Sequence, residues 1–270
     1  MTYIKQLKEL NELMECFFIK GTLTNCFFLA DAFYKYMENN TLSYVFCGKN
    51  LVLLLDKTDF CQLYFYLNDL STGVDLSIDK PVVMEILYRG EKNKPLDLIK
   101  YWSEQGFNHH LLRDNMVASF DSLSLPPVST SNLVLDYVSS SEEALFTEKL
   151  LSNSLDFYTG DLLSIDEIYH FVTNRNIIIA MYNNEMAGVL QFEIRNKIVW
   201  LSHIAVVEKY RGKGIANELI RKYILDNNTE SNTKYQLWVI RDNIPAVKLY
   251  RKFGFINGNK STLAMLKNRS

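Results

Sequence analysis

The sequence has few prolines, few glycines and no long apolar run. Only 5 of its 270 residues are proline and 11 are glycine, which excludes collagen-like and low-complexity chains. No segment approaches about 18 consecutive apolar residues, and the first residues mix acids and lysines in an amphipathic stretch, so we expect neither a membrane span nor a signal peptide. With 48% hydrophobic residues, the chain is long enough to fold as two domains.

Cysteine is also scarce. Cys16, Cys26, Cys47 and Cys61 all lie in the first quarter of the chain, without a Cys-x-x-Cys pair. Apolar residues surround most of them, so we expect buried free thiols, as in a cytoplasmic protein, and not disulfides. The pair at 109–110 is the only adjacent pair of histidines and has no third ligand near it in sequence, so we expect no metal.

An excess of charge of one sign is absent as well. The formal net charge is −2, whereas nucleic-acid-binding proteins are usually strongly basic, so we expect no nucleic-acid partner. The basic residues at 209–213 form a local cluster, as a phosphate site requires.

The most informative segment is IAVVEKYRGKGIA at 204–216. Its first four residues are typical of a strand, and apolar residues at helical spacing begin at Ile215. Between them, Arg211 and Lys213 alternate with two glycines in a turn. A helix start preceded by small residues binds anions, because unpaired N–H groups point outward there and glycine lets the backbone come close. The spacing fits neither a P-loop nor Gly-x-Gly-x-x-Gly.

Two motifs resemble the GNAT superfamily of N-acetyltransferases. Arg211, Gly214 and Ala216 match its Arg/Gln-x-x-Gly-x-Gly/Ala signature, although Glu208 stands where many members carry proline. QLWVIRDNIPAVKLYRKFGF at 236–255 resembles the next strand and helix of that family, in its order and at its usual separation. The resemblance covers about half of the chain. It implies an α+β GNAT fold, a mixed and mostly antiparallel sheet flanked by helices, and transfer of an acetyl group from acetyl-CoA without a metal.

The resemblance also implies how the site is divided. The turn would hold the diphosphate of CoA, and the pantetheine arm would lie along the preceding strand, with a backbone N–H near Val206 as donor to the oxyanion. Asn243 would cap its helix and bond to the arm. Tyr250 would protonate the leaving thiolate, or else pack as an ordinary helix aromatic. The predicted cofactor contacts are Ile204, Ala205, Val206, Arg211, Gly212, Lys213, Gly214, Ile215, Ala216, Asn243 and Tyr250.

The base that deprotonates an incoming amine stays open at this point. His203 lies next to the expected transfer point and has a suitable ordinary pKa. A structural histidine, Glu193 on the neighbouring strand, or ordered water are the alternatives. Strand alternation puts Ser202 on the opposite face from His203, and the sequence does not say which face meets the substrate.

The chain divides at DSLSLPPVSTSN, residues 121–132, which has the composition of a linker. We expect an accessory or degenerate GNAT-like domain at 1–125, a linker at 126–132 and a catalytic domain at 133–270. LIKYWSEQGF at 98–107 aligns with AVKLYRKFGF at 246–255, so the first half is interpreted as a repeat that lost its glycine turn. An unrelated α+β domain is the alternative, because glycine is common at helix ends.

These observations favour a cytoplasmic N-acetyltransferase that acts on a primary amine of a small molecule or peptide. The alternative is a non-catalytic acyl-CoA-binding sensor or assembly module. We expect no membrane partner. The first half could wall the acceptor site, mediate a homodimer or stabilise the catalytic half.

Overall fold

The computed structural model describes residues 1–76, 78–127, 131–227 and 233–269. The chain packs into two compact units: Met1–Leu112 with Ser261–Ser270, and Arg113–Lys260. These bounds differ from the predicted domains, because the first unit ends inside a strand and the end of the chain returns to it. The predicted linker lies within the range of the second unit, and residues 128–130 of it lie outside the described residues.

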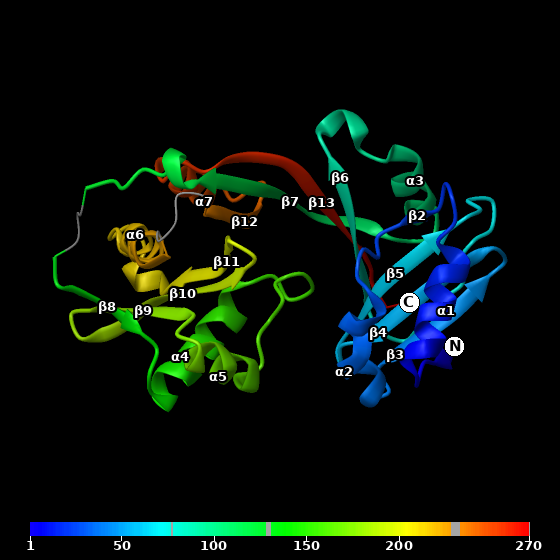
Figure 1. The fold of residues 1–270 in the computed structure, drawn as a ribbon, viewed down its shortest axis with the longest axis horizontal. Helices are drawn as coiled ribbons and strands as arrows, with labels where there is room; N and C mark the ends of the chain where they lie inside the picture. Colours follow the sequence, from blue (N-terminus) through cyan, green and yellow to red (C-terminus); the bar gives the residue numbers. More distant parts are fainter. Residues whose placement is uncertain (77, 128–130, 228–232, 270) are drawn as a thin grey trace. The chain divides into compact units, whose positions relative to one another are not determined.

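The elements follow one another as Figure 1 shows. The first part contains β1 (Thr2–Tyr3), α1 (Leu7–Phe17), β2 (Leu23–Thr24), η1 (Ala30–Phe33), α2 (Tyr34–Glu38), β3 (Leu42–Cys47), β4 (Asn50–Asp56), β5 (Cys61–Leu67), β6 (Val82–Arg89), η2 (Glu91–Asn93), α3 (Leu96–Glu104) and β7 (Asn108–Ser119). The second contains η3 (Phe120–Ser122), β8 (Leu133–Tyr137), α4 (Ser141–Ser154), α5 (Ile165–Thr173), β9 (Ile177–Tyr182), β10 (Glu185–Arg195), β11 (Ile198–Val206), η4 (Glu208–Tyr210), α6 (Ile215–Asn227), β12 (Lys234–Ile240), α7 (Ile244–Lys252) and β13 (Ile256–Lys267).

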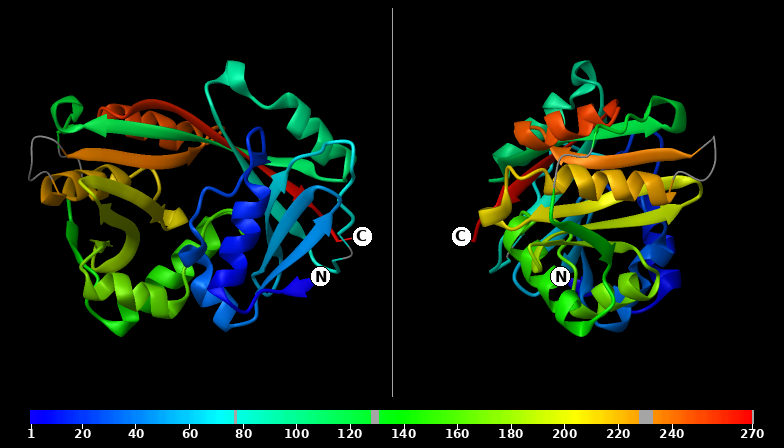
Figure 2. Two further views of the ribbon diagram at one scale, coloured as in Figure 1. Left: turned by 45° about the vertical axis from the view of Figure 1, so that its right-hand side comes forward. Right: turned by 90° about the vertical axis from the view of Figure 1, so that its left-hand side faces the viewer.

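The second unit is a mixed, mostly antiparallel sheet with helices on both faces, as predicted. Its strand order is β13-β7-β12-β11-β10-β9-β8, and β11–β12 is a parallel pair between antiparallel neighbours. One face packs against α6 and α7 and the other against α4 and α5, each with its own apolar cluster. Figure 2 shows these two helical layers on either side of the strands.

Local sequence signals explain the bounds of α4 and α5. Ser140 accepts from the N–H of Glu143, whose carboxylate accepts from the N–H of Ser140. Ser164 and Glu167 repeat this reciprocal pattern at the start of α5. Such capping boxes satisfy N–H groups that have no partner within the helix. The capping boxes therefore set the first residues of α4 and α5.

The first unit repeats the element order of the second, which confirms the tandem GNAT-like architecture. Its order is β1-β3-β4-β5-β6-β13, with β2 paired to β5, and its parallel pair is β5–β6. Between β5 and β6, where the second unit has α6 between β11 and β12, the described residues 68–76 and 78–81 contain no helix. This difference agrees with the predicted loss of the glycine turn.

The predicted alignment of 98–107 with 246–255 is visible in the side chains. Trp102 packs edge-on against Phe107, with ring centroids 5.2 Å apart, and Tyr250 packs in the same manner against Phe255 at 6.0 Å. A glycine with φ near +88° ends each helix, a conformation that side chains disfavour. Trp102 therefore occupies in the first unit the place of Tyr250 in the second.

The two repeats exchange their last strands. β7 ends the first repeat, but its residues from Arg113 onward pair antiparallel with β12. β13 ends the second repeat, but its residues from Ser261 onward belong to the first unit, whose order places it next to β6. Strand exchange explains why the compact units do not coincide with the sequence repeats.

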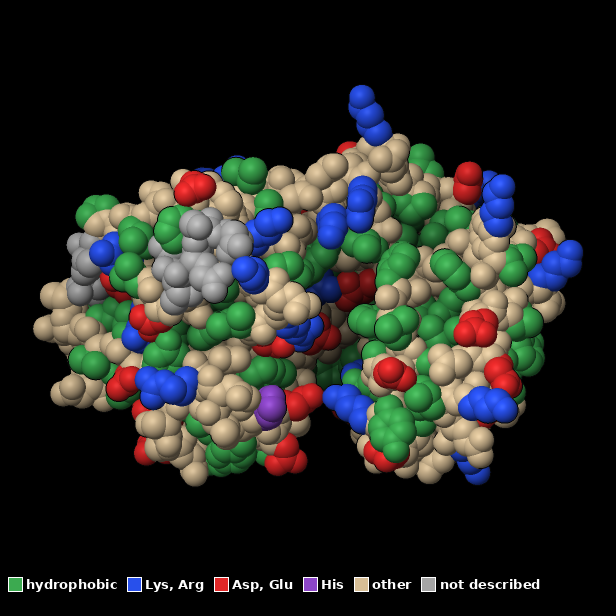
Figure 3. Space-filling view, viewed as in Figure 1, with side chains coloured by type: hydrophobic (Ala, Val, Ile, Leu, Met, Phe, Trp, Pro, Cys, Tyr) green, Lys and Arg blue, Asp and Glu red, His purple; other side chains and the backbone are tan. Residues whose placement is uncertain are grey.

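The state of the cysteines was only partly predicted. All four cysteines are free, as expected, and Cys26 and Cys61 are buried, but Cys16 is exposed on α1 and Cys47 is half-buried. Within the described ranges, none of the helices has the length and apolar character needed to cross a membrane. On the face drawn in Figure 3, acidic and basic side chains are interspersed.

Gly254 provides a test of the repeat's helix ending. A Cβ there would lie 2.0 Å from the carbonyl oxygen of Ser122, in addition to the strain of φ +88°. We expect Gly254→Ala to lower the free energy of unfolding by about 2–4 kcal/mol, measured by urea titration. Gly21→Ala is the control, because Gly21 has φ +94° and open space around it, and we expect a loss of about 1 kcal/mol. Equal losses in the two variants would contradict the steric argument.

Candidate acyl-CoA site

The candidate site begins where β11 separates from β12. The two strands pair only from Ile198–Lys234 to Leu201–Leu237, although both continue for several residues beyond. A β-bulge marks the separation, because Ser202 is an extra residue on β11 relative to β10. In the described part of the chain, the edge of β11 beyond this bulge has no neighbouring strand.

Hydrogen-bond alternation shows which backbone groups lie on that edge. The N–H of Val207 donates to Ala187 on β10 at 2.9 Å. In an antiparallel pair, successive residues point their N–H and C=O groups to opposite sides. Ala205 therefore also faces β10, whereas Ile204 and Val206 face the open edge. Three strand residues were predicted to contact the cofactor. Two of them, Ile204 and Val206, present backbone groups at this open edge, and Ala205 does not.

The loop after β11 has the conformation that its glycines predict. Gly212 has φ +79° and Gly214 has φ +80°, values that would strain any residue with a Cβ. Space around Gly212 is open, with no heavy atom within 4 Å of a built Cβ. The chain then enters α6 at Ile215, whose side chain is buried in the core.

This loop presents N–H groups that the described chain does not use. The N–H of Arg211 donates to Glu208 and that of Asn217 donates to Gly214. Between them, the N–H groups of Gly212, Gly214, Ile215 and Ala216 donate to no group in the described residues. These are the orphan donors of a helix start, at the positive end of the α6 dipole, and they suit an anionic ligand.

Two cations flank these donors. The Arg211 side chain is exposed, and its Nε lies 3.4 Å from the carbonyl oxygen of Val206. The Lys213 ammonium lies 5.7 Å from the centre of the Tyr182 ring. Upstream, the carboxylate of Glu185 bonds to Lys209 and Tyr210, which fixes the turn η4 to β10. The loop therefore has a positively charged surface, and the turn that precedes it is held to β10.

Tyr250 and the open edge belong to one layer. Tyr250 is 4% exposed in the α6–α7 core cluster, and Ile204 and Val206 pack against the same cluster. Burial raises the pKa of the Tyr250 hydroxyl well above its ordinary value, so it is protonated at neutral pH. This hydroxyl makes no hydrogen bond within the described residues.

Asn243 has the capping role predicted for it. Its Oδ1 accepts from the N–H of Ala246 at 3.2 Å, and Pro245 stands in the first turn of α7. Proline suits this position because its missing N–H would have no helical partner. The additional contact of Asn243 with a cofactor stays a prediction.

His203 lies on the other face of the sheet. His203 and Ala205 are two residues apart on β11, so their side chains point to the same face of the sheet. Ala205 packs in the α4–α5 cluster. Burial lowers the pKa of His203 below its ordinary value, against the opposing influence of Asp161 and Glu193. Glu193 itself accepts from Arg195 Nε at 2.9 Å. His203 is therefore neutral at pH 7, while Glu193 already has a partner.

Sequence reasoning missed Gln191, which pairs with His203 across β10 and β11. Its side chain is 1% exposed, and its Oε1 has no hydrogen-bond partner in the described chain. A buried, unpartnered acceptor is costly and is often used by a ligand or water. The signal in the sequence was a polar residue within the apolar run GVLQF.

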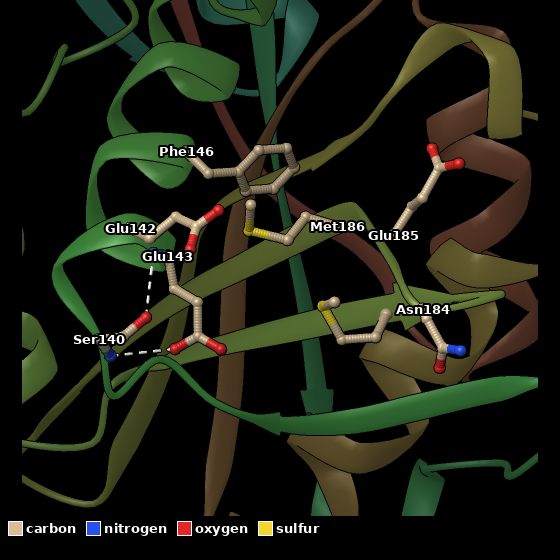
Figure 4. Close-up of a pocket in the computed structure, with 8 residues that line it drawn as sticks. Ser140, Glu142, Glu143, Phe146, Asn184, Glu185 and Met186 are labelled. Carbon is tan, nitrogen blue, oxygen red and sulfur yellow. Dashed lines mark hydrogen bonds between the residues drawn. The ribbon is translucent and has the colours of Figure 1, made fainter.

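A cavity of about 460 Å³ lies elsewhere in the second unit, between the start of α4 and the β9–β10 turn. Figure 4 shows Phe146 and Met186 between Glu143 on one side and Glu185 on the other. Glu143 serves the capping box and Glu185 holds η4, so two of the three acidic residues that line the cavity have structural partners. None of the predicted site residues lines it, and we assign it no chemistry.

Among the described residues, no group of three or more His, Cys, Asp or Glu is arranged to hold a metal ion.

Comparison with known proteins identifies the domain that contains this geometry. Residues 143–255 match the model of the acetyltransferase (GNAT) family. These residues include the open edge of β11, the glycine loop and Tyr250. The search of curated proteins found no match to this chain.

Solved structures resemble this chain over 81–85% of its length. A GCN5-related N-acetyltransferase from Sphaerobacter thermophilus has a TM-score of 0.57 at 12% identity, over 81% of this chain and 76% of that one. A GCN5-related N-acetyltransferase from Kribbella flavida has a TM-score of 0.53 at 11% identity, over 85% and 90%.

A tandem GNAT protein from the clavulanic acid biosynthesis pathway also has a TM-score of 0.53, at 12% identity, over 85% of this chain and 84% of that one. At these identities the likeness is one of fold. Together with the family match, it shows a GNAT domain at residues 143–255 within a chain of tandem GNAT-like architecture.

Proposed function

We propose that the second unit is an acetyl-CoA-dependent N-acetyltransferase that acts on a primary amine of a small molecule or peptide. The observation that carries this proposal is a strand edge without a neighbouring strand in the described chain, followed by a loop of unused N–H groups. Ile204 and Val206 present backbone groups at this edge, where the Val206 carbonyl oxygen accepts from Arg211 Nε, and the glycine loop follows after η4. An extended amide-containing arm that ends in a diphosphate fits this sequence of donors and acceptors.

The residues of the site divide the reaction between them. The loop N–H groups, Arg211 and Lys213 hold the diphosphate. The Val206 N–H donates to the thioester carbonyl oxygen, which gains negative charge as the amine nitrogen attacks the carbonyl carbon. When the carbon–sulfur bond breaks, the sulfur takes the electron pair, and the Tyr250 hydroxyl supplies its proton. The product is an amide and a free thiol.

The amine must lose a proton before it can attack, because an ammonium has no lone pair. We propose that His203 accepts this proton, directly or through water held by Gln191. Its neutral state at pH 7 and the unpartnered Gln191 oxygen support this role. An acyl-CoA-binding sensor or assembly module is the alternative function, and the presence of Tyr250 together with the glycine loop favours the enzyme.

The setting of the reaction is part of the proposal. We place the protein in the cytoplasm, with an amine acceptor as its partner and without a nucleic-acid or membrane partner. We propose two roles for the first unit: it mediates a homodimer, or it stabilises the catalytic half.

Charge reversal at the loop tests cofactor binding. Acetyl-CoA at a hundredfold excess over its Kd should stabilise the wild-type protein by about 2.7 kcal/mol. We expect Arg211→Glu to abolish this gain, because its carboxylate would repel the diphosphate. Lys149→Glu on exposed α4 makes the same charge change on the opposite face and should keep the gain. Thermal unfolding with and without acetyl-CoA measures both. Lack of any shift in the wild type would refute the enzyme and the sensor alike.

Tyr250→Phe separates the enzyme from the sensor. It removes only the hydroxyl, and it leaves the ring packed against Phe255. We expect kcat to fall by about 10²–10⁴ while the Kd for acetyl-CoA is unchanged. Thiol release with a panel of amines measures the rate, and calorimetry measures the affinity. Unchanged turnover would exclude Tyr250 as the acid.

His203→Gln tests the base. The lowered pKa of His203 predicts that kcat/KM falls on the acid side with a midpoint below about 6.5, because protonated His203 cannot accept a proton. We expect the variant to be slower at pH 7 and to lose this acid limb. His109→Gln, at an exposed position on β7, should keep it. An acid limb that survives in His203→Gln would assign the proton to another group.

A further inference from the structure

The first unit contains the counterpart of the open strand edge. β5 runs parallel to β6 only at Cys61–Val82 and Gln62–Val83, and both strands then continue apart, as β11 and β12 do in the second unit. The N–H of Cys61 donates to Pro81, on the β6 side, at 2.8 Å. By alternation, Leu63 and Phe65 also direct their backbone groups to that side.

Here the edge is filled by the chain itself. Asn25 Nδ2 donates to the carbonyl oxygen of Leu63 at 2.9 Å, and the N–H of Phe65 donates to Asn25 Oδ1 at 2.8 Å. Thr24 Oγ1 donates to the carbonyl oxygen of Phe65 at 2.6 Å. Further along, Leu23 pairs with Leu67 as part of β2. The Leu63 carbonyl and both backbone groups of Phe65 therefore have partners from one short segment.

Asn25 has the chemistry of a peptide group at this position. Its amide offers one donor and one acceptor to two residues of the same strand, as the amide of an extended arm would. The side chain is 9% exposed, so the contact is an interior one. β2 has no counterpart between α4 and α5, where the described chain forms no strand.

Other features of a cofactor site are also changed in the first unit. Trp102 takes the place of Tyr250, and an indole N–H is no acid at neutral pH. Its Nε1 is buried without a hydrogen-bond partner in the described chain. The helix that would present a glycine loop to a diphosphate is missing between β5 and β6 within the described residues.

We propose that Leu23–Asn25 is a built-in substitute for the acyl-CoA arm, bonded along the edge of β5 where β6 has separated from it. The equivalence rests on the proposed function of the second unit, where the arm lies along β11. The protein consequently binds one acetyl-CoA per chain, in the second unit.

Residue-resolved amide hydrogen exchange tests the substitution in the wild-type protein. We expect the Phe65 amide to exchange slowly, at the same rate with and without saturating acetyl-CoA. The Ile204 and Val206 amides should exchange fast in the free protein and slowly with acetyl-CoA. Fast exchange at Phe65, or slowing there on addition of acetyl-CoA, would overturn the substitution. Unchanged exchange at Ile204 and Val206 would overturn the proposed function, and the Phe65 result would still decide the first unit.

Asn25→Ala tests the contact itself. Loss of the acceptor should accelerate Phe65 exchange about tenfold or more. Asn93→Ala is the matched control, because Asn93 bonds the backbone of Arg89 at the surface of the same unit, and it should leave Phe65 unchanged. Continued protection in Asn25→Ala would contradict the proposal. If that variant fails to fold, calorimetry of the wild type decides: one acetyl-CoA per chain is expected, and two would overturn the proposal.

Discussion

The site depends on the early separation of two parallel strands. A strand edge carries N–H and C=O groups that are costly to bury without partners. When β11 leaves β12 after Leu201, its edge must be satisfied by water, a ligand or another part of the chain. The chain shows two solutions to the same constraint. The edge of β11 leads to a loop of unused N–H groups, whereas the edge of β5 is satisfied by Asn25 and Thr24.

The strand exchange gives the first repeat a structural part in the second unit. β7 belongs to the first repeat but holds β12 through its whole length, with Ser119 opposite Lys234 and Arg113 opposite Ile240. At the end of β12, Arg241 forms a two-point ion pair with Asp114, at 2.8 and 3.0 Å. β12 precedes α7 and therefore positions Tyr250. Of the roles expected for the first half, this geometry favours support of the second half.

Short-range signals made the second unit predictable, and long-range pairing did not. The capping boxes of α4 and α5, the glycine loop and the Asn243 cap each follow from residues a few positions apart. The bounds of the compact units differ from those of the predicted domains. The composition of 121–132 is typical of a linker, whereas strand pairing between residues more than a hundred positions apart sets the units. Gln191 was missed because its significance depends on a buried side-chain oxygen without a hydrogen-bond partner, which the sequence does not show.

The differences between the two repeats agree with one another when their individual contacts are compared. A tyrosine at a thiol-bearing arm is useful only if the arm can enter, and an open edge is tolerable only if something satisfies it. Once Asn25 occupies the edge of β5, an acid above it has no substrate, and Trp102 can replace it as a packing residue against Phe107. Conversely, a side chain bonded in this way along β11 would compete with the arm for the backbone groups of Ile204 and Val206. The open edge, the glycine loop and Tyr250 therefore occur together in the second unit, and the first repeat lacks all three.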